Sequence, residues 1–240
     1  MRAAIHQPDF MPWLGFFHKL SLVDTFIVFD HVQISMGKSW SSRNRVLLKE
    51  APVWLTIPII RKGVSTQAIF ETRLNRDVRY GRKHLGTLKQ AYGKCSFFAE
   101  VMDELAPIYE QDFEYLIDFN MAFIRKVIDC FGWQKKIMYS REILQEKPLL
   151  KQLKGNDAVL ALCQAAGVTD YISGTGCTDF ILPDSFEEKG IRFTFQEFKH
   201  PVYSQYNHRG EFVSHLSCLD ALFNMGFDAL RTVLTENVTI

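Results

Sequence analysis

Two histidines of this chain each follow a predicted strand and each lie beside a proline and a nearby amide. His6 ends a short apolar run and is followed by Gln7 and Pro8, and His200 is followed by Pro201. Imidazole titrates near neutral pH, so either histidine could act as a general base. The alternative for His6 is a histidine whose ring nitrogens only hold a turn in place. The residues alone leave both interpretations open.

A carboxylate, a glycine-rich turn and a thiol also follow predicted strands. Asp30 ends the apolar run of residues 25–29, where it could polarise a histidine, bind a sugar hydroxyl or cap a helix. Ser173 and Gly174 begin a turn that could hold a phosphate or an oxyanion, although the Walker pattern of a P-loop is absent. Cys177 could be a nucleophile if a neighbouring cation favoured its thiolate, or a small buried apolar residue.

Further polar and aromatic side chains could contact a ligand. The polar segment 35–45 has the composition of a loop, and its cations could clamp a diphosphate or a carboxylate, because guanidinium groups pair with such anions in a forked geometry. A solvated loop is the alternative. Beyond His200, tyrosine and glutamine side chains could hydrogen-bond to a sugar and stack on it, and Ser217 could cap a helix. The candidate ligand contacts are Gln7, Trp13, Lys38, Arg43, Asn44, Ser173, Gly174, Tyr203, Gln205, Ser217, Asp220 and Asn224.

The hydropathy pattern predicts the elements that position these residues. Residues 3–5, 13–23 and 25–29 have the pattern of a right-handed strand–helix–strand unit. Further strands are predicted at 53–57, 136–139, 170–172 and 191–198, and helices over 77–132, at 155–167 and near 219–224 and 227–234. We therefore expect one domain over residues 1–240, an α/β fold with a mostly parallel, open, Rossmann-like sheet and a helical insert around residues 77–132. The polar strand ends should converge, because the carboxyl ends of parallel strands share one edge.

Composition excludes several classes of protein. The chain has 240 residues, a net charge of +1 and 47% hydrophobic residues, so it can bury a core and shows no bias toward nucleic acid. Its five cysteines are odd in number and none are paired at CxxC spacing, which disfavours a disulfide framework and a zinc site. No signal-peptide layout and no membrane-spanning run is present. We expect a cytoplasmic protein without a bound metal.

Several stretches in combination resemble the WbqC-like family of bacterial proteins. They are IHQPDFMPWLGFFHKL, DTFIVFDHVQ, SRNRV followed by VWLTIPI, YISG, and FKHPVYSQ leading to LSCLDALFNMG, and they extend along nearly the whole chain. Such proteins are found with genes for O-antigen and other surface polysaccharides. The resemblance implies an acyltransferase or aminoacyltransferase, with a nucleotide-linked amino sugar and an acyl or aminoacyl donor such as a glycyl donor as partners. It names no cofactor.

One turn departs from the family pattern. Where the family often has SGPAAK followed by an acidic and an aromatic residue, this chain has SGTGCTDF. Thr178 stands where the lysine is frequent, and Cys177 precedes it. If that lysine serves chemistry, this member is altered, and the same mismatch weakens the interpretation of Cys177 as a family nucleophile.

Two other functions remain open from the residues. The stretch Gly15-Phe16-Phe17-His18 matches part of the HxGH helix of adenylyl-transfer enzymes and ligases but lacks its first histidine. A nucleotide-activating enzyme of that type is one alternative, on analogy of fold alone. A non-catalytic partner that binds a sugar nucleotide is the other.

Overall fold

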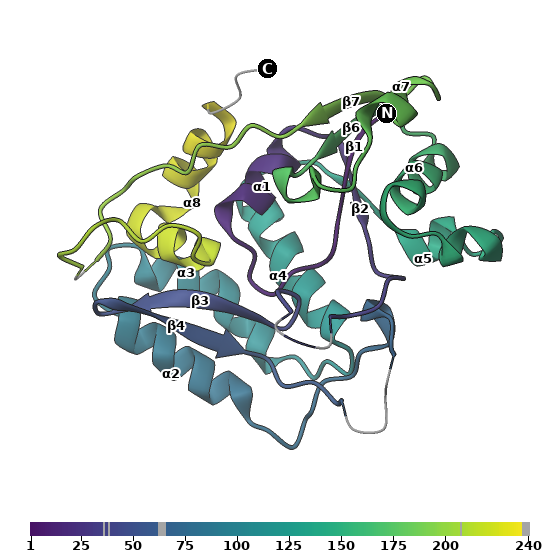
Figure 1. Cartoon of the computed structure of the whole chain (residues 1–240). Coiled ribbons are helices and arrows are strands. Elements are labelled where there is room, and N and C mark those ends of the chain that lie inside the picture. The colour runs from purple at the N-terminus through teal and green to yellow at the C-terminus, as the bar shows by residue number, and fades with distance from the viewer. Residues whose placement is uncertain (36, 38, 62–65, 207, 237–240) are drawn as a thin grey trace.

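A five-stranded, all-parallel sheet forms the centre of the molecule (Figure 1). The computed structural model describes residues 1–35, 37, 39–61, 66–206 and 208–236. The strands lie in the order β5-β2-β1-β6-β7. Their bounds are β1 Arg2–His6, β2 Thr25–Val28, β5 Lys136–Tyr139, β6 Asp170–Ser173 and β7 Arg192–Phe195. The predicted α/β class with an open, parallel, Rossmann-like sheet is confirmed.

The order of the strands places β1 in the middle of the sheet. Ala4 pairs with Phe26 of β2 on one side and with Ile172 of β6 on the other. From β1 the chain builds outward to β2 and β5, and then returns to add β6 and β7 on the opposite side. The strand order therefore reverses between β1 and β6, and in open α/β sheets ligands bind in the crevice outside the carboxyl ends at such a point.

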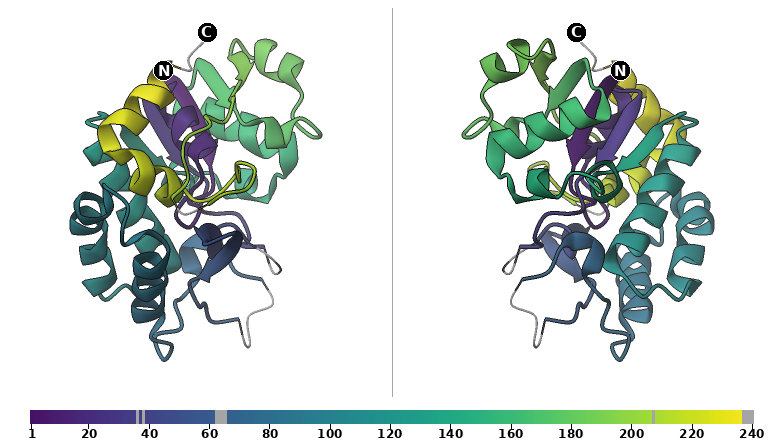
Figure 2. Two further views of the ribbon diagram at one scale, coloured as in Figure 1. Left: turned by 90° about the vertical axis from the view of Figure 1, so that its left-hand side faces the viewer. Right: turned by 90° about the vertical axis from the view of Figure 1, so that its right-hand side faces the viewer.

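Helices cover both faces of the sheet (Figure 2). Phe26 and Val28 point into one core, against α1 Leu14–Ser21, α4 Leu116–Cys130 and α8 Cys218–Glu236. Ile27, between them, points into the opposite core, against α5 Ser140–Ile143, α6 Gly155–Ala166 and α7 Pro183–Glu187. A strand buried on both faces is apolar throughout, which explains the continuous apolar run in the sequence.

A separate hairpin lies beyond the carboxyl ends of β1 and β2 (Figure 1). It consists of β3 Arg43–Leu48 and β4 Ala51–Thr56, paired antiparallel. Two expectations are corrected here. The strand expected at 53–57 belongs to this hairpin and not to the parallel sheet, and the segment expected as a loop to residue 45 is a strand from Arg43 onward. Asn44 and Val46 are buried and Arg43 and Arg45 are not, so the strand alternates as its pleat requires.

The helical stretch between the hairpin and β5 contains α2 Tyr80–Tyr92 and α3 Phe98–Leu105 as well as α4. Short 3₁₀ turns occur at Ile69–Glu71, Ala106–Glu110, Pro148–Gln152 and Thr175–Cys177. One apolar core joins these helices with the hairpin and one face of the sheet. Helix α8 contains a break at Gly226, with φ 78° and ψ 174°, as the two predicted C-terminal helices require. Within the described residues, no helix is long and apolar enough to cross a membrane.

Candidate functional site

Two buried asparagines hold the proline-flanked loop that follows β1. The Asn120 side-chain amide, on α4, donates to the carbonyl oxygens of Pro8 at 2.7 Å and of Ser41 at 2.8 Å. The Asn44 amide, on β3, donates to the carbonyl oxygen of Met11 at 2.8 Å. The loop is therefore fixed between the hairpin and α4. It delivers the side chains next to it in a defined geometry, as a site for chemistry requires.

His6 lies at the carboxyl end of β1 with one ring nitrogen committed. Its Nδ1 is 2.9 Å from the carbonyl oxygen of Gln7, which can only accept, so Nδ1 carries the proton and Nε2 holds the lone pair. The ring contacts Phe16 edge-on at 5.1 Å between centroids. Burial, with a smaller effect from the charge of Lys19, lowers the pKa of His6 to about 3. The imidazole is therefore neutral at pH 7, and its Nε2 lone pair is unprotonated.

Asp9 and Lys19 have pKa values shifted toward neutrality beside His6. Asp9 Oδ2 lies 3.8 Å from His6 Nδ1. Burial raises the pKa of Asp9 to about 7, although the charge of Lys19 opposes the shift. Burial lowers the pKa of Lys19 to about 8, and the charges of Cys177 and Asp9 oppose this shift. Groups that titrate near the working pH are suited to general acid–base chemistry.

The turn after β6 faces the same group of side chains. Ser173 is buried, and Gly174 lies so close to Lys19 that a Cβ atom added to Gly174 would be 3.5 Å from Nζ. Cys177 is half-buried and interacts electrostatically with Lys19. The structure therefore brings His6, Ser173, Gly174 and Cys177 together at the point where the strand order reverses. We call His6, Asp9, Lys19, Ser173, Gly174 and Cys177 the β1–β6 site.

His200 belongs to a second group, near the start of α1. Its Nδ1 donates to the carbonyl oxygen of Pro201 at 2.8 Å, which repeats the local geometry of His6. Its ring contacts His215 at 5.7 Å between centroids, and His215 stacks on Trp13 at 5.2 Å. Burial lowers the pKa of His200. Within the described part of the chain, no hydrogen bond, ion pair or ring contact joins His200 to His6.

Asp220 ties this second group to the helices. Its fully buried carboxylate accepts hydrogen bonds from Tyr92, Tyr203 and Gln205, each at 2.8 Å. Burial raises its pKa, and the three hydrogen bonds oppose that shift. The Asn224 amide donates to the Asp220 carbonyl oxygen one helical turn back. Asp220 thus holds Tyr92, Tyr203 and Gln205 together by hydrogen bonds at the start of α8.

Ser217 begins that helix. Its hydroxyl accepts a hydrogen bond from the N–H of Leu219 at 3.3 Å, as the predicted helix cap would. Its backbone N–H donates to the carbonyl oxygen of Arg45 on the hairpin. Ser217 therefore fastens the start of α8 to β3, close to Trp13, with which it forms an isolated backbone bridge.

Asp30 forms a third group, on the β5 side of the sheet. Its carboxylate accepts hydrogen bonds from the hydroxyl of Ser140 at 2.9 Å and from the N–H of Arg141 at 3.0 Å, and it pairs with the Arg141 guanidinium at 2.9 Å. The Ser140 hydroxyl also lies 2.7 Å from His31 Nδ1. Asp30 therefore interacts with the residues after β5 and not with His6.

An open hollow borders this third group. It has a volume of about 510 Å³, and it is lined by Phe70, Glu71, Arg73, Tyr115, Ile117, Asp118 and Arg141. Its cations are already paired, since Arg141 binds Asp30 and Arg73 binds Glu114 at 3.2 Å. The size suits a small organic ligand.

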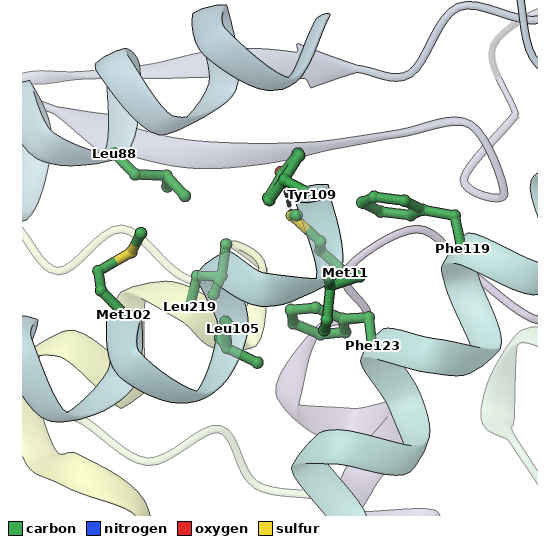
Figure 3. A pocket seen from close by; sticks show the side chains of 9 residues that line it. Met11, Leu88, Met102, Leu105, Tyr109, Phe119, Phe123 and Leu219 are labelled. Atoms are coloured by element: carbon green, nitrogen blue, oxygen red, sulfur yellow. Dashed lines mark hydrogen bonds between the residues drawn. The ribbon is translucent and has the colours of Figure 1, made fainter. Parts of the chain in front are cut away.

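A second hollow lies inside the core between α2, α3, α4 and the opening loop (Figure 3). Its volume is about 10 Å³. The side chains around it are apolar apart from the hydroxyl of Tyr109, which points toward the sulfur of Met11. A space of this size and polarity has no room for a ligand and is a packing void.

Two residues that the sequence predicts to contact a ligand, Arg43 and Asn44, lie at the start of the hairpin. The Arg43 guanidinium lies over the ring of Trp54 at 4.1 Å, and Trp54 in turn contacts Trp40 at 5.6 Å between centroids. Both tryptophans are about half exposed. Asn44 is buried and holds the loop as described above. Lys38 lies outside the described residues.

Sequence reasoning missed Asp9, Lys19 and Arg141. Lys19 follows His18 near the end of a short helix, and two adjacent polar residues are typical of a solvent-exposed helix end. In the structure the whole stretch from Leu14 to Leu20 is buried, Lys19 included. His18 is buried, and its Nδ1 lies 2.7 Å from the side-chain nitrogen of Gln196.

Comparison with known proteins agrees with this description. The family model of the WbqC-like protein family matches residues 7–232, so the chain belongs to that family. The chain is also similar to a Mycobacterium tuberculosis protein named "Uncharacterized protein Rv1507c", with 30% identity over 230 residues that cover 95% of each chain. No solved structure matches. Membership of the WbqC-like family suggests a role in polysaccharide biosynthesis.

Proposed function

We propose that this protein transfers an acyl or aminoacyl group, such as a glycyl group, onto the amine of a nucleotide-linked amino sugar. The observation that carries the proposal is the state of His6. Its Nδ1 proton is committed to Gln7, so Nε2 has a free lone pair at the carboxyl end of the central strand. The family context of surface polysaccharides supports the choice of substrate.

In the proposed reaction the sugar amine attacks the carbonyl carbon of the acyl donor. A carbon–nitrogen bond forms, the bond between the carbonyl carbon and the leaving group breaks, and the amine proton passes to His6 Nε2 and then to the leaving group. The charge that develops on His6 is favoured by the Asp9 carboxylate, 3.8 Å from Nδ1. The turn at Ser173 and Gly174 would stabilise the oxyanion in the proposed reaction.

The other predicted residues support this centre in the proposal. His200, Trp13, Tyr203 and Gln205 form an aromatic and polar group around the start of α1, where a sugar could be hydrogen-bonded and stacked. Asn44 positions the loop between β1 and α1. Arg43, over the exposed ring of Trp54, would contact the nucleotide.

The test is a transfer assay with the purified full chain. Glycyl and acetyl thioesters are offered as donors with a panel of nucleotide-linked amino sugars, and N-acylated products are detected by mass spectrometry. His6→Ala should lower kcat/KM by about 10²–10⁴-fold, the contribution of a positioned general base. His208→Ala is the matched control, because His208 pairs with Glu50 at 3.0 Å on a distant loop, and it should keep full activity.

Full transfer activity of His6→Ala would refute the role of His6 as the general base. Tight binding of sugar nucleotides by the wild-type protein with no turnover of any donor in the panel would refute the proposed transfer and favour the non-catalytic binding partner.

A further inference from the structure

Lys19 is a buried cation without a matching anion. The residue is 3% exposed, at the end of α1 that lies against β1 and β6. An ammonium group has three donors, yet the hydrogen bond that Nζ makes among the described residues is a long one, 3.5 Å to the carbonyl oxygen of Ile5. No carboxylate oxygen of those residues lies within the 4.0 Å of an ion pair. A buried charge in this condition is costly unless something else pairs with it.

The neighbouring turn has no side chain at Gly174, the position closest to the ammonium group. Gly174 has φ −76° and ψ 151°, which any residue adopts, so the backbone does not require a glycine there. A Cβ atom at Gly174 would stand 3.5 Å from Lys19 Nζ, and one at Gly176 would meet nothing within 4 Å. The absence of a side chain at Gly174 therefore leaves room for at least one further atom in van der Waals contact with Nζ. The space lies at the reversal of strand order, where open α/β sheets bind ligands.

We propose that Lys19, beside the glycine at position 174, binds a phosphoryl group of the nucleotide-linked substrate. The inference rests on the proposed function for the identity of that substrate, and on the unpaired ammonium group for the site itself. A lysine is a compact cation that binds phosphate oxygens as a point charge. A phosphoryl group carries more negative charge than a carboxylate and so offsets more of the cost of the buried cation.

Binding should depend on pH in a direction that the surroundings of Lys19 determine. The pKa of Lys19 is lowered to about 8, mainly by burial, so the side chain is charged at pH 7 and loses its proton above pH 8. The titratable groups that act on it are Asp9, His6 and Cys177. Asp9, with its pKa raised to about 7, gains charge as the pH rises and repels an anion. Affinity for a phosphoryl group should therefore fall from pH 7 to pH 9.

The probe is inorganic pyrophosphate, titrated into the full chain by calorimetry at pH 7 and pH 9. The wild type should bind it at pH 7, and Lys19→Met should bind at least tenfold more weakly. Lys19→Arg should lose less affinity than the wild type between the two pH values, because guanidinium stays charged and only the ionisation of Asp9 still opposes binding. Lys89→Met is the matched control, since Lys89 is exposed on α2, and it should bind as the wild type does.

A second variant guards against a Lys19 substitution that fails to fold. Gly174→Val keeps the backbone conformation but places a side chain beside Nζ, so it should also lower pyrophosphate affinity at least tenfold. Equal binding by the folded wild type and by either Lys19→Met or Gly174→Val would overturn the site, as would the absence of binding by the wild type. So would binding of acetate with the same affinity as pyrophosphate, because the ligand would then be a carboxylate.

The two proposals fail separately. Lys19-dependent pyrophosphate binding without any transfer activity would refute the proposed function and support the phosphoryl site. Transfer activity without Lys19-dependent binding would refute the phosphoryl site alone.

Discussion

Replacing Asn120 with alanine should destabilise the protein strongly, although Asn120 is far in sequence from everything it holds. Its amide nitrogen donates to two buried carbonyl oxygens, those of Pro8 and Ser41. Its own side-chain oxygen has no partner among the described residues, so the stabilisation comes from the two donated bonds. Alanine at this position would leave both carbonyl groups buried without a donor.

The magnitude follows from that count. Each buried polar group left without its partner costs about 1–3 kcal/mol, and partial relaxation reduces the sum, so the free energy of unfolding should fall by about 2–4 kcal/mol. With a urea dependence of about 2–3 kcal/mol per molar, the midpoint should move down by about 1 M. The N–H of Phe10, in the loop that Asn120 holds, donates to the carbonyl oxygen of Trp40 just before β3. This N–H should exchange faster with solvent in the variant.

Urea unfolding followed by circular dichroism, with hydrogen exchange at Phe10, measures both effects. Asp129→Ala on the exposed side of the same helix is the control and should change the free energy of unfolding by no more than about 0.5 kcal/mol. An unchanged midpoint for Asn120→Ala would show that solvent or the loop itself satisfies the two carbonyls. The account of the loop as fixed by α4 would then be wrong.

Two further variants test the packing around α1 and the burial of a histidine. Gly15→Ala should lower the free energy of unfolding by about 1–3 kcal/mol and change tryptophan fluorescence, because its Cβ would lie 2.3 Å from the Trp13 ring. Gly86→Ala is the control and should raise the free energy of unfolding, because its Cβ would meet nothing within 4 Å. Equal effects of the two variants would refute the close packing at Gly15. Burial lowers the pKa of His84 to about 4, so the unfolded chain binds more protons between pH 6.5 and 4 and stability should fall as the pH falls through that window. His84→Gln should remove about 3 kcal/mol of this pH dependence in unfolding measured across the window, and an unchanged slope would contradict the burial of a neutral imidazole.

The parallel sheet could be predicted from the sequence, and the hairpin could not. Strands such as 25–28 are buried on both faces, so their residues are apolar throughout and the signal is local. The start of β3 carries Arg43, Asn44 and Arg45 in a row, which has the composition of a loop. Asn44 is buried, and its amide donates to the carbonyl oxygen of Met11, which is distant in the sequence. A local hydropathy pattern cannot indicate such a contact.

The candidate site was predictable only in part for the same reason. His6, Ser173 and Gly174 end predicted strands, and the convergence of strand ends follows from the parallel topology. The burial of Lys19 depends on a turn more than 150 residues later in the chain. The interactions of Asp30 depend on Ser140 and Arg141, which follow the neighbouring strand β5 more than 100 residues later in the chain.

The position of β1 in the middle of the sheet also determines the state of the chain while it is being made. The first strand synthesised pairs early with β2, but its other edge has no partner until residues 170–173 are available, and the outer edge of β2 waits for residues 136–139. Between about residues 28 and 136 the nascent chain therefore carries two strand edges that still lack their partners, and such edges are templates for association with other chains. The edge of β1 is covered only when β6 is made, so the central strand of the sheet is among the last to gain both of its neighbours.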